Sequence, residues 1–330
     1  MRRYSIIIPV KPGGTVAALG PLGTLTADPG DFEIIITEGC SPSRQRNAAA
    51  AVAEGEILYF LDDDSRVSPR CLETLDRLLD DRRVTVAGGP SVTPDDDTPL
   101  QKLFAAALTS LFGAGGVRNR YRSAGTVRET TEKELILCNL AFRRQPFLDH
   151  GGFDERLYPN EENELLDRIQ RGGGKLIHDP GLAVRRSQRR TLGQFVRQMY
   201  SYGRGRARQT LIAGPAAGIA YAPLALLIYL AALPLFSFSS LAFLPLAAYL
   251  CLDLLFTVAA VVSGRSLRNM FLFLLFPLMH ISNGIGLLTG FIEGGRGAER
   301  PAAQDPVLYR AKGFGGACEA RLPAKTVGIQ

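Results

Sequence analysis

The stretch from about residue 214 to 292 constrains the fold most, because it is nearly continuous apolar sequence. It divides into three segments of membrane length, roughly 214–236, 240–262 and 270–292. A helix needs about 20 predominantly apolar residues to cross a bilayer, and each segment has them. The sequence therefore predicts a membrane region of three helices that follows an ordinary soluble portion.

Charges between these segments predict their orientation. Residues 237–239 carry no charge, whereas 263–269 contain Arg265 and Arg268. Because arginine and lysine concentrate in cytoplasmic loops, we expect a first hairpin with both ends in the cytoplasm. The third segment contains Pro277, His280 and Asn283, so it bends or packs against protein. If it crosses, the polar tail of residues 293–330 ends outside, although the six basic residues of that tail argue against this.

A block of arginines precedes the first apolar segment. The net charge is +6, and eight arginines with no acid lie between Ala183 and Ala213. Their position predicts a basic interfacial helix over residues 191–213 that contacts anionic membrane lipid on the cytoplasmic side. Nucleic-acid binding would need basic charge interleaved with aromatics on a domain face, so we expect no nucleic-acid partner.

Cysteine usage and the N-terminus indicate the compartment. The five cysteines are scattered without a Cys-x-x-Cys pair, which fits a reducing compartment and predicts neither zinc nor a disulfide framework. The apolar run after Met1-Arg2-Arg3 is too short for a signal peptide. We therefore expect a multi-pass protein of the plasma (inner) membrane with a cytoplasmic catalytic domain.

Residues 1–190 alternate strand-like and helix-like segments. Strands are predicted at Tyr4–Val10, Phe32–Thr37 and Ile57–Leu61, with helical stretches between them. Further strands are predicted at 84–87, 135–142 and 175–177. This alternation predicts an α/β fold with a doubly wound, mostly parallel sheet.

The strand Ile57–Leu61 runs directly into three acids, Asp62, Asp63 and Asp64. It is apolar on both faces, as buried parallel strands are, and ligands bind outside the carboxyl ends of such strands. Three adjacent carboxylates repel one another unless a cation lies between them, which favours a divalent cation bound to a substrate diphosphate. The alternative is a solvated turn that caps the helix after Pro69.

Two predicted helices and one histidine also have alternative interpretations. Residues 100–112 have the spacing of an amphipathic helix, which packs on the sheet or lies at the membrane interface beside a lipid acceptor. Asn160–Gln170 is predicted as a helix whose first turn carries Glu161, Glu162 and Glu164, and acids there complement the helix dipole. His178 is interpreted as a turn residue, with a ligand as the alternative.

Several motifs in the order of the chain resemble glycosyltransferase family 2 over about residues 4–210. They are Ser5-Ile-Ile-Ile-Pro-Val, Arg46-Asn47, Gly55-Glu56 to Asp64, Asn139-Leu-Ala-Phe-Arg-Arg, Gly151-Gly-Phe-Asp-Glu-Arg and Glu161-Glu162-Asn163-Glu164-Leu165. The segment Arg189–Arg208 and the end of the third apolar segment resemble the membrane-anchored, succinoglycan-type exopolysaccharide glycosyltransferases.

The resemblance implies a GT-A fold, a nucleotide-sugar donor, Mn²⁺ or Mg²⁺, and inversion at the anomeric carbon. By position, Pro9, Lys11 and Glu38 would hold the nucleotide base, and Arg46 would lie near the diphosphate. Asp62 and Asp64 occupy the acids of the family's Asp-x-Asp, in which the Asp64 position binds metal.

Other site residues are also implied by the resemblance. Glu161 and Glu162 occupy the family's Glu-Asp pair, whose second member is the catalytic base. Asp63 is grouped with the donor-binding acids, and Asn139 with the acceptor or diphosphate. We add Arg204 and Arg206 to that last group, because the glycines of Tyr202-Gly-Arg-Gly-Arg allow close backbone approach.

The chain departs from the family pattern at three places. Glu38 stands where many members have Asp-Asp, and Glu162 replaces the usual Asp of the base. Arg185 or Arg186 stands where many relatives have a metal-binding histidine, so the metal has fewer protein ligands or an arginine neutralises the leaving diphosphate. The Gln-x-x-Arg-Trp of processive synthases is absent, and the chain has no tryptophan. We therefore expect one sugar to be added per encounter.

The expected function is transfer of that sugar to a polyprenyl diphosphate-linked saccharide, whose anionic headgroup would lie in the plane of the arginine block. A carboxylate such as Glu162 would remove the proton of the acceptor hydroxyl. Two alternatives stay open: a polyprenyl-phosphate sugar synthase, and a non-catalytic membrane scaffold of a polysaccharide assembly complex.

Overall fold

The computed structural model describes residues 2–215, 217–236, 238–294 and 305–316. The chain divides into two compact units, which are described separately. The first contains the described residues of 2–92, 122–186 and 305–316, and the second contains 93–121 and 187–294.

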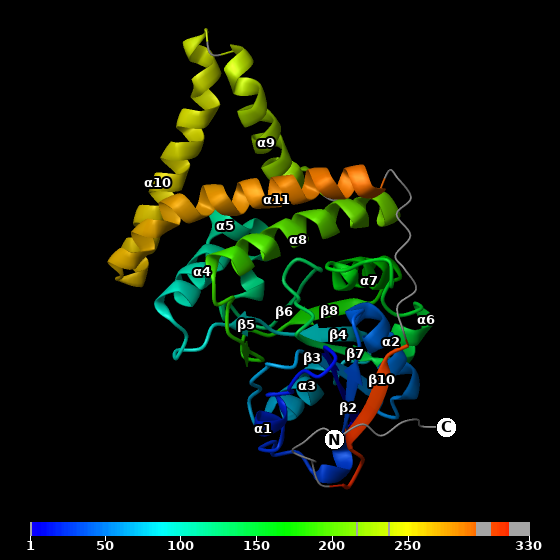
Figure 1. Ribbon diagram of the computed structural model, residues 1–330. Helices are drawn as coiled ribbons and strands as arrows, with labels where there is room; N and C mark the ends of the chain where they lie inside the picture. The colour runs from blue at the N-terminus through cyan, green and yellow to red at the C-terminus, as the bar shows by residue number, and fades with distance from the viewer. Residues whose placement is uncertain (1, 216, 237, 295–304, 317–330) are drawn as a thin grey trace. The chain divides into compact units, whose positions relative to one another are not determined.

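The first unit is built on one mixed sheet (Figure 1). Among the described residues it has eight strands in the order β10-β2-β1-β3-β7-β4-β8-β6. The strands are β1 (Tyr4–Val10), β2 (Phe32–Glu38), β3 (Ile57–Leu61), β4 (Val84–Gly88), β6 (Arg128–Glu129), β7 (Asn139–Arg143), β8 (Lys175–His178) and β10 (Val307–Lys312). A two-stranded sheet pairs β5 (Ser91–Val92) with β9 (Val184–Arg185).

Strand directions confirm a mostly parallel centre and add antiparallel strands. β1 is parallel to β2 and β3, and β4 is parallel to β8. β7 is inserted between β3 and β4 and is antiparallel to both. The predicted strand 135–142 therefore begins late, because β7 covers Asn139–Arg143.

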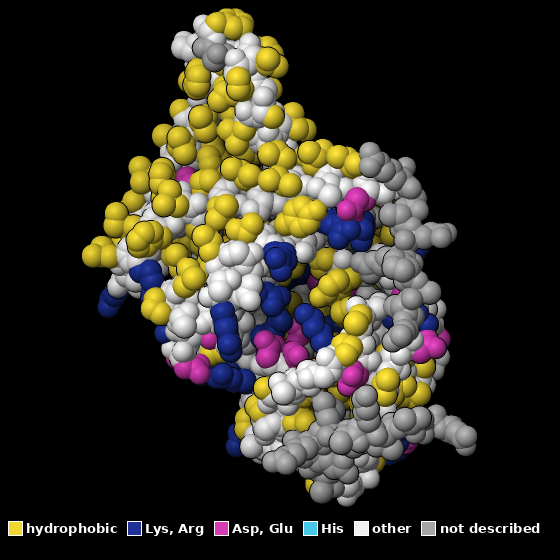
Figure 2. Space-filling view, viewed as in Figure 1, with side chains coloured by type: hydrophobic (Ala, Val, Ile, Leu, Met, Phe, Trp, Pro, Cys, Tyr) yellow, Lys and Arg dark blue, Asp and Glu magenta, His cyan; other side chains and the backbone are white. Residues whose placement is uncertain are grey.

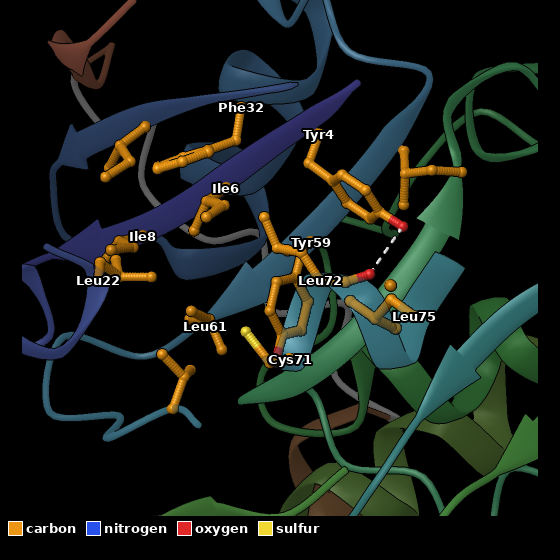
Figure 3. Close-up of a cluster of buried hydrophobic side chains, with 14 of the residues drawn as sticks. Tyr4, Ile6, Ile8, Leu22, Phe32, Tyr59, Leu61, Cys71, Leu72 and Leu75 are labelled. Atoms are coloured by element: carbon orange, nitrogen blue, oxygen red, sulfur yellow. Dashed lines mark hydrogen bonds between the residues drawn. The ribbon is translucent and has the colours of Figure 1, made fainter. Parts of the chain in front are cut away.

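Helices of the first unit connect these strands. They are α1 (Leu19–Leu22), η1 (Pro29–Asp31), α2 (Pro42–Val52), α3 (Cys71–Leu78), α6 (Arg144–Asp149) and α7 (Glu161–Arg171). Apolar side chains that alternate along β1 divide between the two faces of the sheet: Ile6 and Ile8 join one buried cluster, and Ile7 joins the other. Figure 3 shows the first cluster, where the Tyr4 hydroxyl donates a hydrogen bond to the Leu72 carbonyl at 3.4 Å.

The second cluster is rich in aromatic rings. Phe60 of β3 lies 5.7 Å from Phe142 of β7, 5.5 Å from Phe147 of α6 and 5.3 Å from Phe153, measured between ring centroids. Such edge and tilted contacts add to the energy of burial. This cluster fixes β3, and with it the position of the acids that follow β3.

The second unit is helical. It contains α4 (Pro99–Thr109), α5 (Leu111–Ala114), η2 (Gly115–Arg120), α8 (Leu192–Ala213), η3 (Gly218–Tyr221), α9 (Ala222–Ala232), η4 (Leu233–Phe236), η5 (Ser240–Phe243), α10 (Leu244–Gly264), η6 (Leu267–Phe271) and α11 (Leu272–Gly294). Three stretches of the described chain are long and apolar enough to cross a membrane: Gly218–Phe236, Ser240–Gly264 and Leu267–Gly294. Figure 2 shows the hydrophobic side chains that cover the hairpin of α9 and α10.

The predicted helix 100–112 is broken rather than continuous. α4 ends at Thr109, and the next helical segment, Leu111–Arg120, is bent from it by 68°. Ser110 causes the break: it has extended backbone angles, and its hydroxyl accepts a hydrogen bond from Phe112 N at 3.2 Å. A serine in this role starts a new helix, which the apolar spacing alone did not predict.

Candidate active site

The predicted base-binding residues lie at the carboxyl ends of two neighbouring strands. Val10 pairs with Glu38 across β1 and β2, and Pro9 pairs with Thr37. The Glu38 carboxylate accepts a hydrogen bond from Gly13 N at 3.3 Å, which ties the loop after β1 to the end of β2. The exposed Lys11 belongs to this loop. Their role in base binding stays a prediction.

Gln45 in α2 has a structural role that the sequence did not suggest. Its side-chain amide donates to Val10 O at 2.9 Å and to Thr37 O at 2.6 Å. These bonds satisfy carbonyl groups at the ends of β1 and β2, and they fix α2 against the strand ends. No motif signalled this residue, because its partners are defined by the sheet.

The acids after β3 form a tight turn. Asp62 N donates to Ser65 Oγ at 3.1 Å, and Ser65 N donates to Asp62 O at 3.1 Å. The Asp63 carbonyl accepts from Ala18 N at 2.9 Å. Hydroxyl side chains favour such turns. The turn expected as the alternative to a metal site is therefore present, and it presents the carboxylates at the strand end.

Arg46 bridges the two groups of acids that the sequence predicted for catalysis. It comes from α2 and is buried, with 5% of its surface exposed. Its Nη1 lies 3.1 Å from Glu161 Oε1, and its Nη2 lies 3.1 Å from Asp62 Oδ1. The structure therefore brings Arg46, Asp62 and Glu161 together although 115 residues separate Arg46 from Glu161.

Arg186 extends this network on the other side of Asp62. Its Nη2 lies 3.0 Å from Asp62 Oδ2, and its Nε lies 2.7 Å from Asp64 Oδ1. Of the two arginines that follow the last predicted strand, Arg186 thus contacts both Asp-x-Asp acids. The result is a chain of alternating charges, Glu161–Arg46–Asp62–Arg186–Asp64, in one unit of the protein.

Burial and neighbouring charges raise the pKa of two acids here. Burial raises the pKa of Asp63, and the neighbouring Asp64 and Asp62 carboxylates raise it further. Burial also raises the pKa of Glu161, with a further contribution from Glu162, while Arg46 acts in the opposite direction. Raised carboxyl pKa values of this kind are frequent at functional sites.

Glu161 and Glu162 begin α7. Asn160, before them, has a left-handed backbone with φ of 88°, which ends the preceding loop and turns the chain into the helix. Glu161 is 2% exposed and Glu162 is 9% exposed. The Glu161 Oε2 atom is buried and accepts no hydrogen bond from any residue that the structure describes. An unsatisfied buried carboxylate oxygen is costly unless a ligand or proton contacts it.

Asn139 does not join this network. It is fully buried, its Oδ1 accepts a hydrogen bond from the Tyr59 hydroxyl at 2.7 Å, and its Nδ2 donates to the Leu182 carbonyl. These bonds hold β7 to its neighbours. The structure thus gives Asn139 a place inside the first unit, and its assignment to the acceptor stays a prediction.

Arg204 and Arg206 lie on α8 in the second unit. Arg204 Nε is 2.6 Å from Glu293 Oε2, and Arg208 Nη2 is 2.9 Å from the same oxygen. Arg206 donates to Gln209 Oε1 at 2.9 Å. The arginine block has no acid within it, but Glu293 at the end of α11 supplies one. The acceptor role of these arginines stays a prediction.

The carboxylates after β3 fit a divalent cation only in part. Among the described residues, no group of three or more histidine, cysteine or acidic side chains is arranged to hold a metal. Asp62 and Asp64 offer oxygen ligands, and Arg186 lies against both. Mg²⁺ is commonly bound through one or two carboxylates together with substrate phosphates and water. These residues therefore fit a cation that arrives with a diphosphate.

Comparisons with known proteins identify the family of the chain. The family model "Glycosyl transferase family group 2" matches residues 57–292. The succinoglycan biosynthesis protein ExoA of Rhizobium meliloti is 25% identical over 213 residues, which cover 56% of this chain and 62% of that protein. A pre-mycofactocin glycosyltransferase of Mycobacterium tuberculosis is 26% identical over 165 residues, or 49% of this chain and 33% of that protein. The chain thus spans a third to less than two thirds of these relatives.

Among solved structures, the mannosyltransferase PcManGT of Pyrobaculum calidifontis, in complex with GDP-Man and Mn²⁺, is similar in fold. The TM-score is 0.53 at 15% sequence identity, and the match covers 90% of this chain and 88% of that one. This similarity confirms the predicted GT-A-type sheet. Because the family model covers more than half of the chain, the protein belongs to glycosyl transferase family group 2.

Proposed function

We propose that the protein is an inverting transferase that moves one sugar from a nucleotide diphosphate sugar to a lipid-linked saccharide. The observation that carries this proposal is the network Glu161–Arg46–Asp62–Arg186–Asp64 at the carboxyl end of β3. Breaking the bond between a sugar and a diphosphate builds negative charge on the leaving group. Two guanidinium groups and a cation at the acids are suited to stabilise that charge.

Arg46 and Arg186 are proposed to orient the diphosphate. Guanidinium groups bind phosphate oxygens through two parallel N–H donors. Both side chains already lie within 3.1 Å of the acids, so they are held in place before a donor binds. Such preorganised charge needs no rearrangement when the leaving group becomes anionic.

Glu162 is proposed as the base that takes the proton of the acceptor hydroxyl. It is nearly buried at the start of α7, next to Glu161, whose ion pair with Arg46 fixes the first turn of the helix. A general base within hydrogen-bond reach contributes roughly 100-fold to 10,000-fold. Glu161 is proposed as the positioning residue of the pair.

Asp62 and Asp64 are proposed to hold Mn²⁺ or Mg²⁺ when the donor is bound. Such a cation neutralises charge on the phosphate oxygens. PcManGT is described with GDP-Man and Mn²⁺, which supports the same pairing here. The base-binding residues Pro9, Lys11 and Glu38 would hold the nucleotide at the ends of β1 and β2.

The acceptor is proposed to be a polyprenyl diphosphate-linked saccharide at the cytoplasmic face of the plasma membrane. The long apolar helices support membrane association, and the arginines before α9 would attract an anionic headgroup. The resemblance to ExoA supports an acceptor used in cell-surface polysaccharide synthesis.

Purified full-length protein tests this function. It is incubated with nucleotide sugars, Mn²⁺ and either a lipid extract that contains diphosphate-linked saccharides or a simple polyprenyl phosphate. Mass spectrometry that finds one added sugar on the diphosphate-linked saccharide supports the proposal. A sugar found only on the polyprenyl phosphate would overturn the acceptor. Asp64→Asn should abolish turnover, and Asp63→Asn is the matched control with a smaller loss.

A further inference from the structure

The C-terminal strand β10 belongs to the sheet of the first unit, and this limits how the chain crosses the membrane. β10 lies antiparallel beside β2, with Val307 opposite Glu38 and Arg310 opposite Ile35 (Figure 1). The sequence predicted only a polar tail at this position. Since β2 belongs to the soluble unit, residues 307–312 must be on the same side of the membrane as that unit.

Buried charged contacts make β10 a specific part of the sheet. Glu33 in β2 is fully buried, and its Oε2 lies 3.2 Å from Arg310 Nε. The Lys312 ammonium donates to Pro29 O at 2.6 Å and to Phe32 O at 2.7 Å. Arg310 also pairs with Glu54 at 2.7 Å. A buried carboxylate needs a cationic partner, so Arg310 ties the tail to this strand.

The number of membrane crossings between α8 and β10 must therefore be even. The chain enters the helical unit from the first unit before α8 and returns to the first unit at β10. Residues 295–304 contain Arg296, Glu299 and Arg300 in ten positions, and such a segment does not cross hydrocarbon. Three crossings by α9, α10 and α11 are thus incompatible with β10.

The helix that does not cross is identified by its packing. In the 18-residue apolar window of each candidate span among the described residues, 0% of the window in Gly218–Phe236 and 11% of that in Ser240–Gly264 is buried, against 44% of that in Leu267–Gly294. A helix that is apolar on all sides and uncovered by protein needs lipid around it. α9 meets that description, and α10 meets it except on the side of Asp253 and Thr257, which are buried, whereas α11 is covered by protein along one face.

The cover over the first half of α11 comes from α4 and the start of α8. Leu275, Phe276 and Met279 belong to a buried cluster with Phe104 of α4 and Phe195 of α8. The rings of Phe104 and Phe195 are stacked, with centroids 4.3 Å apart.

The second half of α11 lies directly along α8. A side chain at Gly286 would meet the Tyr200 carbonyl at 2.0 Å, and one at Gly290 would meet the Arg204 carbonyl at 2.7 Å. Asn283 donates to Met199 O at 3.2 Å. These glycines allow the two backbones to touch, so α8 and α11 form a single packed pair (Figure 1).

This pairing excludes a spanning position for α11. If α11 crossed, the stretch of α8 beside it would enter the hydrocarbon with Arg204, Arg206 and Arg208. Each arginine at the bilayer centre costs about 2.5–3.5 kcal/mol on translocon scales, and more on an isolated helix. At the membrane surface the same side chains reach water and phosphate at no such cost.

We propose that, of the three long apolar helices, α9 and α10 cross the membrane as a hairpin, while α11 lies flat in the membrane surface along α8. α11 would contact the headgroups of the cytoplasmic leaflet and the part of the acyl chains next to them. The face of α11 that enters this layer carries Leu274, Ile285 and Ile292, which are 68%, 43% and 49% exposed. The chain is also in the first unit before and after the bent pair of α4 and residues 111–120, so this pair must likewise contribute an even number of crossings.

Cysteine labelling of the full-length protein in cells tests the number of crossings. The exposed Cys40 and Cys251, together with Cys318, are replaced by serine, and the parent without added cysteine measures background from the buried Cys71 and Cys138. Single cysteines are then placed at Ser240 in the hairpin tip, Ser266 between α10 and α11, and Gly313 after β10. A side chain at Gly313 meets open space. Retained transferase activity shows that each variant folds.

An impermeant maleimide should label Ser240→Cys in intact cells, and it should label Ser266→Cys and Gly313→Cys only after permeabilisation. Labelling of Gly313→Cys in intact cells would mean an odd number of crossings and would overturn the proposal. Labelling of Ser266→Cys in intact cells would mean that α10 and α11 cross instead. If none of the three is labelled in intact cells, no helix crosses and the hairpin is wrong.

Spin labels measure whether α11 lies flat. Leu274→Cys, Ile285→Cys and Ile292→Cys are labelled in vesicles that contain anionic lipid, and oxygen and nickel accessibility give their depths. Leu274 and Ile285 are 11 residues apart, which is about 16 Å along a helix. A flat helix gives three similar depths. A spanning helix would place Ile285 about 10 Å deeper than Ile292, which is seven residues further along, and would put Leu274 and Ile292 near opposite membrane surfaces. That result would overturn the proposal even if transfer activity is normal.

Discussion

Replacing Arg186 should make the donor-free protein bind divalent cations more tightly. The guanidinium lies 3.0 Å from Asp62 and 2.7 Å from Asp64, so a cation held by both acids must displace it. The side chains of Arg186, Asp62 and Asp64 are 23%, 21% and 47% exposed, so water screens both ion pairs. Such pairs contribute roughly 0.2–1 kcal/mol each. Losing up to two of them should improve Mn²⁺ affinity about 2-fold to 30-fold.

Free Mn²⁺ measured by electron paramagnetic resonance on nucleotide-free protein provides the assay. Arg186→Ala is compared with Arg185→Ala, which removes the neighbouring arginine in β9, and with Arg186→Lys, which keeps a charge. We expect tighter Mn²⁺ binding in the alanine variant at position 186 alone. Unchanged or weaker Mn²⁺ binding there would show that Arg186 and the cation do not compete for Asp62 and Asp64.

Three further predictions concern the catalytic acids and the C-terminal strand. Glu162→Gln should leave donor binding intact and lower the rate of transfer at least about 100-fold. Glu161→Gln should cause a smaller loss. If single-turnover assays show the reverse, Glu161 is the base. Because burial and Glu162 raise the pKa of Glu161 from 4.5 to about 8, the stability that its protonated form contributes is complete below pH 4.5 and is lost as pH rises to about 8. Thermal unfolding of Glu161→Gln should lack this loss relative to the native protein, and parallel pH profiles would contradict it. Arg310→Ala leaves Glu33 buried without its cation and should lower the free energy of unfolding by about 3 kcal/mol. The control Arg44→Ala removes an exposed pair with Asp305 and should cost under about 1 kcal/mol. Equal losses in denaturation would show that the pair between Arg310 and the buried Glu33 does not stabilise the sheet.

Local patterns predicted the centre of the fold well. The β-branched runs of β1 to β3 and the helical stretches between them define parallel strands, and the acids after Leu61 lie at a strand end as expected. The predictions were less accurate where the structure depends on contacts distant in sequence. β7 is antiparallel and begins at Asn139, because it is inserted between β3 and β4. Apolar spacing cannot show that insertion.

The sequence indicated which residues form the network around Asp62, but not which of them contact one another. Sequence motifs indicated Arg46, Asp62, Asp64 and Glu161 as site residues, yet nothing in the spacing shows that Arg46 contacts both groups of acids. Arg186 could be suspected from its position after the last strand, while its contact with both Asp62 and Asp64 required the geometry.

β10 was missed because its sequence signal is weak. Val307–Lys312 is six residues long, contains two cations, and lies at the sheet edge, where charged residues are common. Its partner β2 is more than 260 residues away in the sequence, so no local pattern connects them. Without β10 the number of membrane crossings could not be predicted, because the strand requires that number to be even.

The charge of the site predicts how donor and cation bind. Asp62 and Asp64 contribute two negative charges and Arg46 and Arg186 two positive charges, and Glu161 adds a negative charge when it is ionised, before Glu162 and Asp63 are counted. A diphosphate would add to that negative charge, and burial of like charges is unfavourable. A cation that arrives with the diphosphate removes this repulsion, so each should increase the affinity of the other. Because linkage is reciprocal, the factor by which Mn²⁺ tightens nucleotide binding must equal the factor by which nucleotide tightens Mn²⁺ binding. Calorimetric titrations in both orders measure the two factors, and nucleotide that binds equally well in EDTA would show that Arg46 and Arg186 alone neutralise the diphosphate.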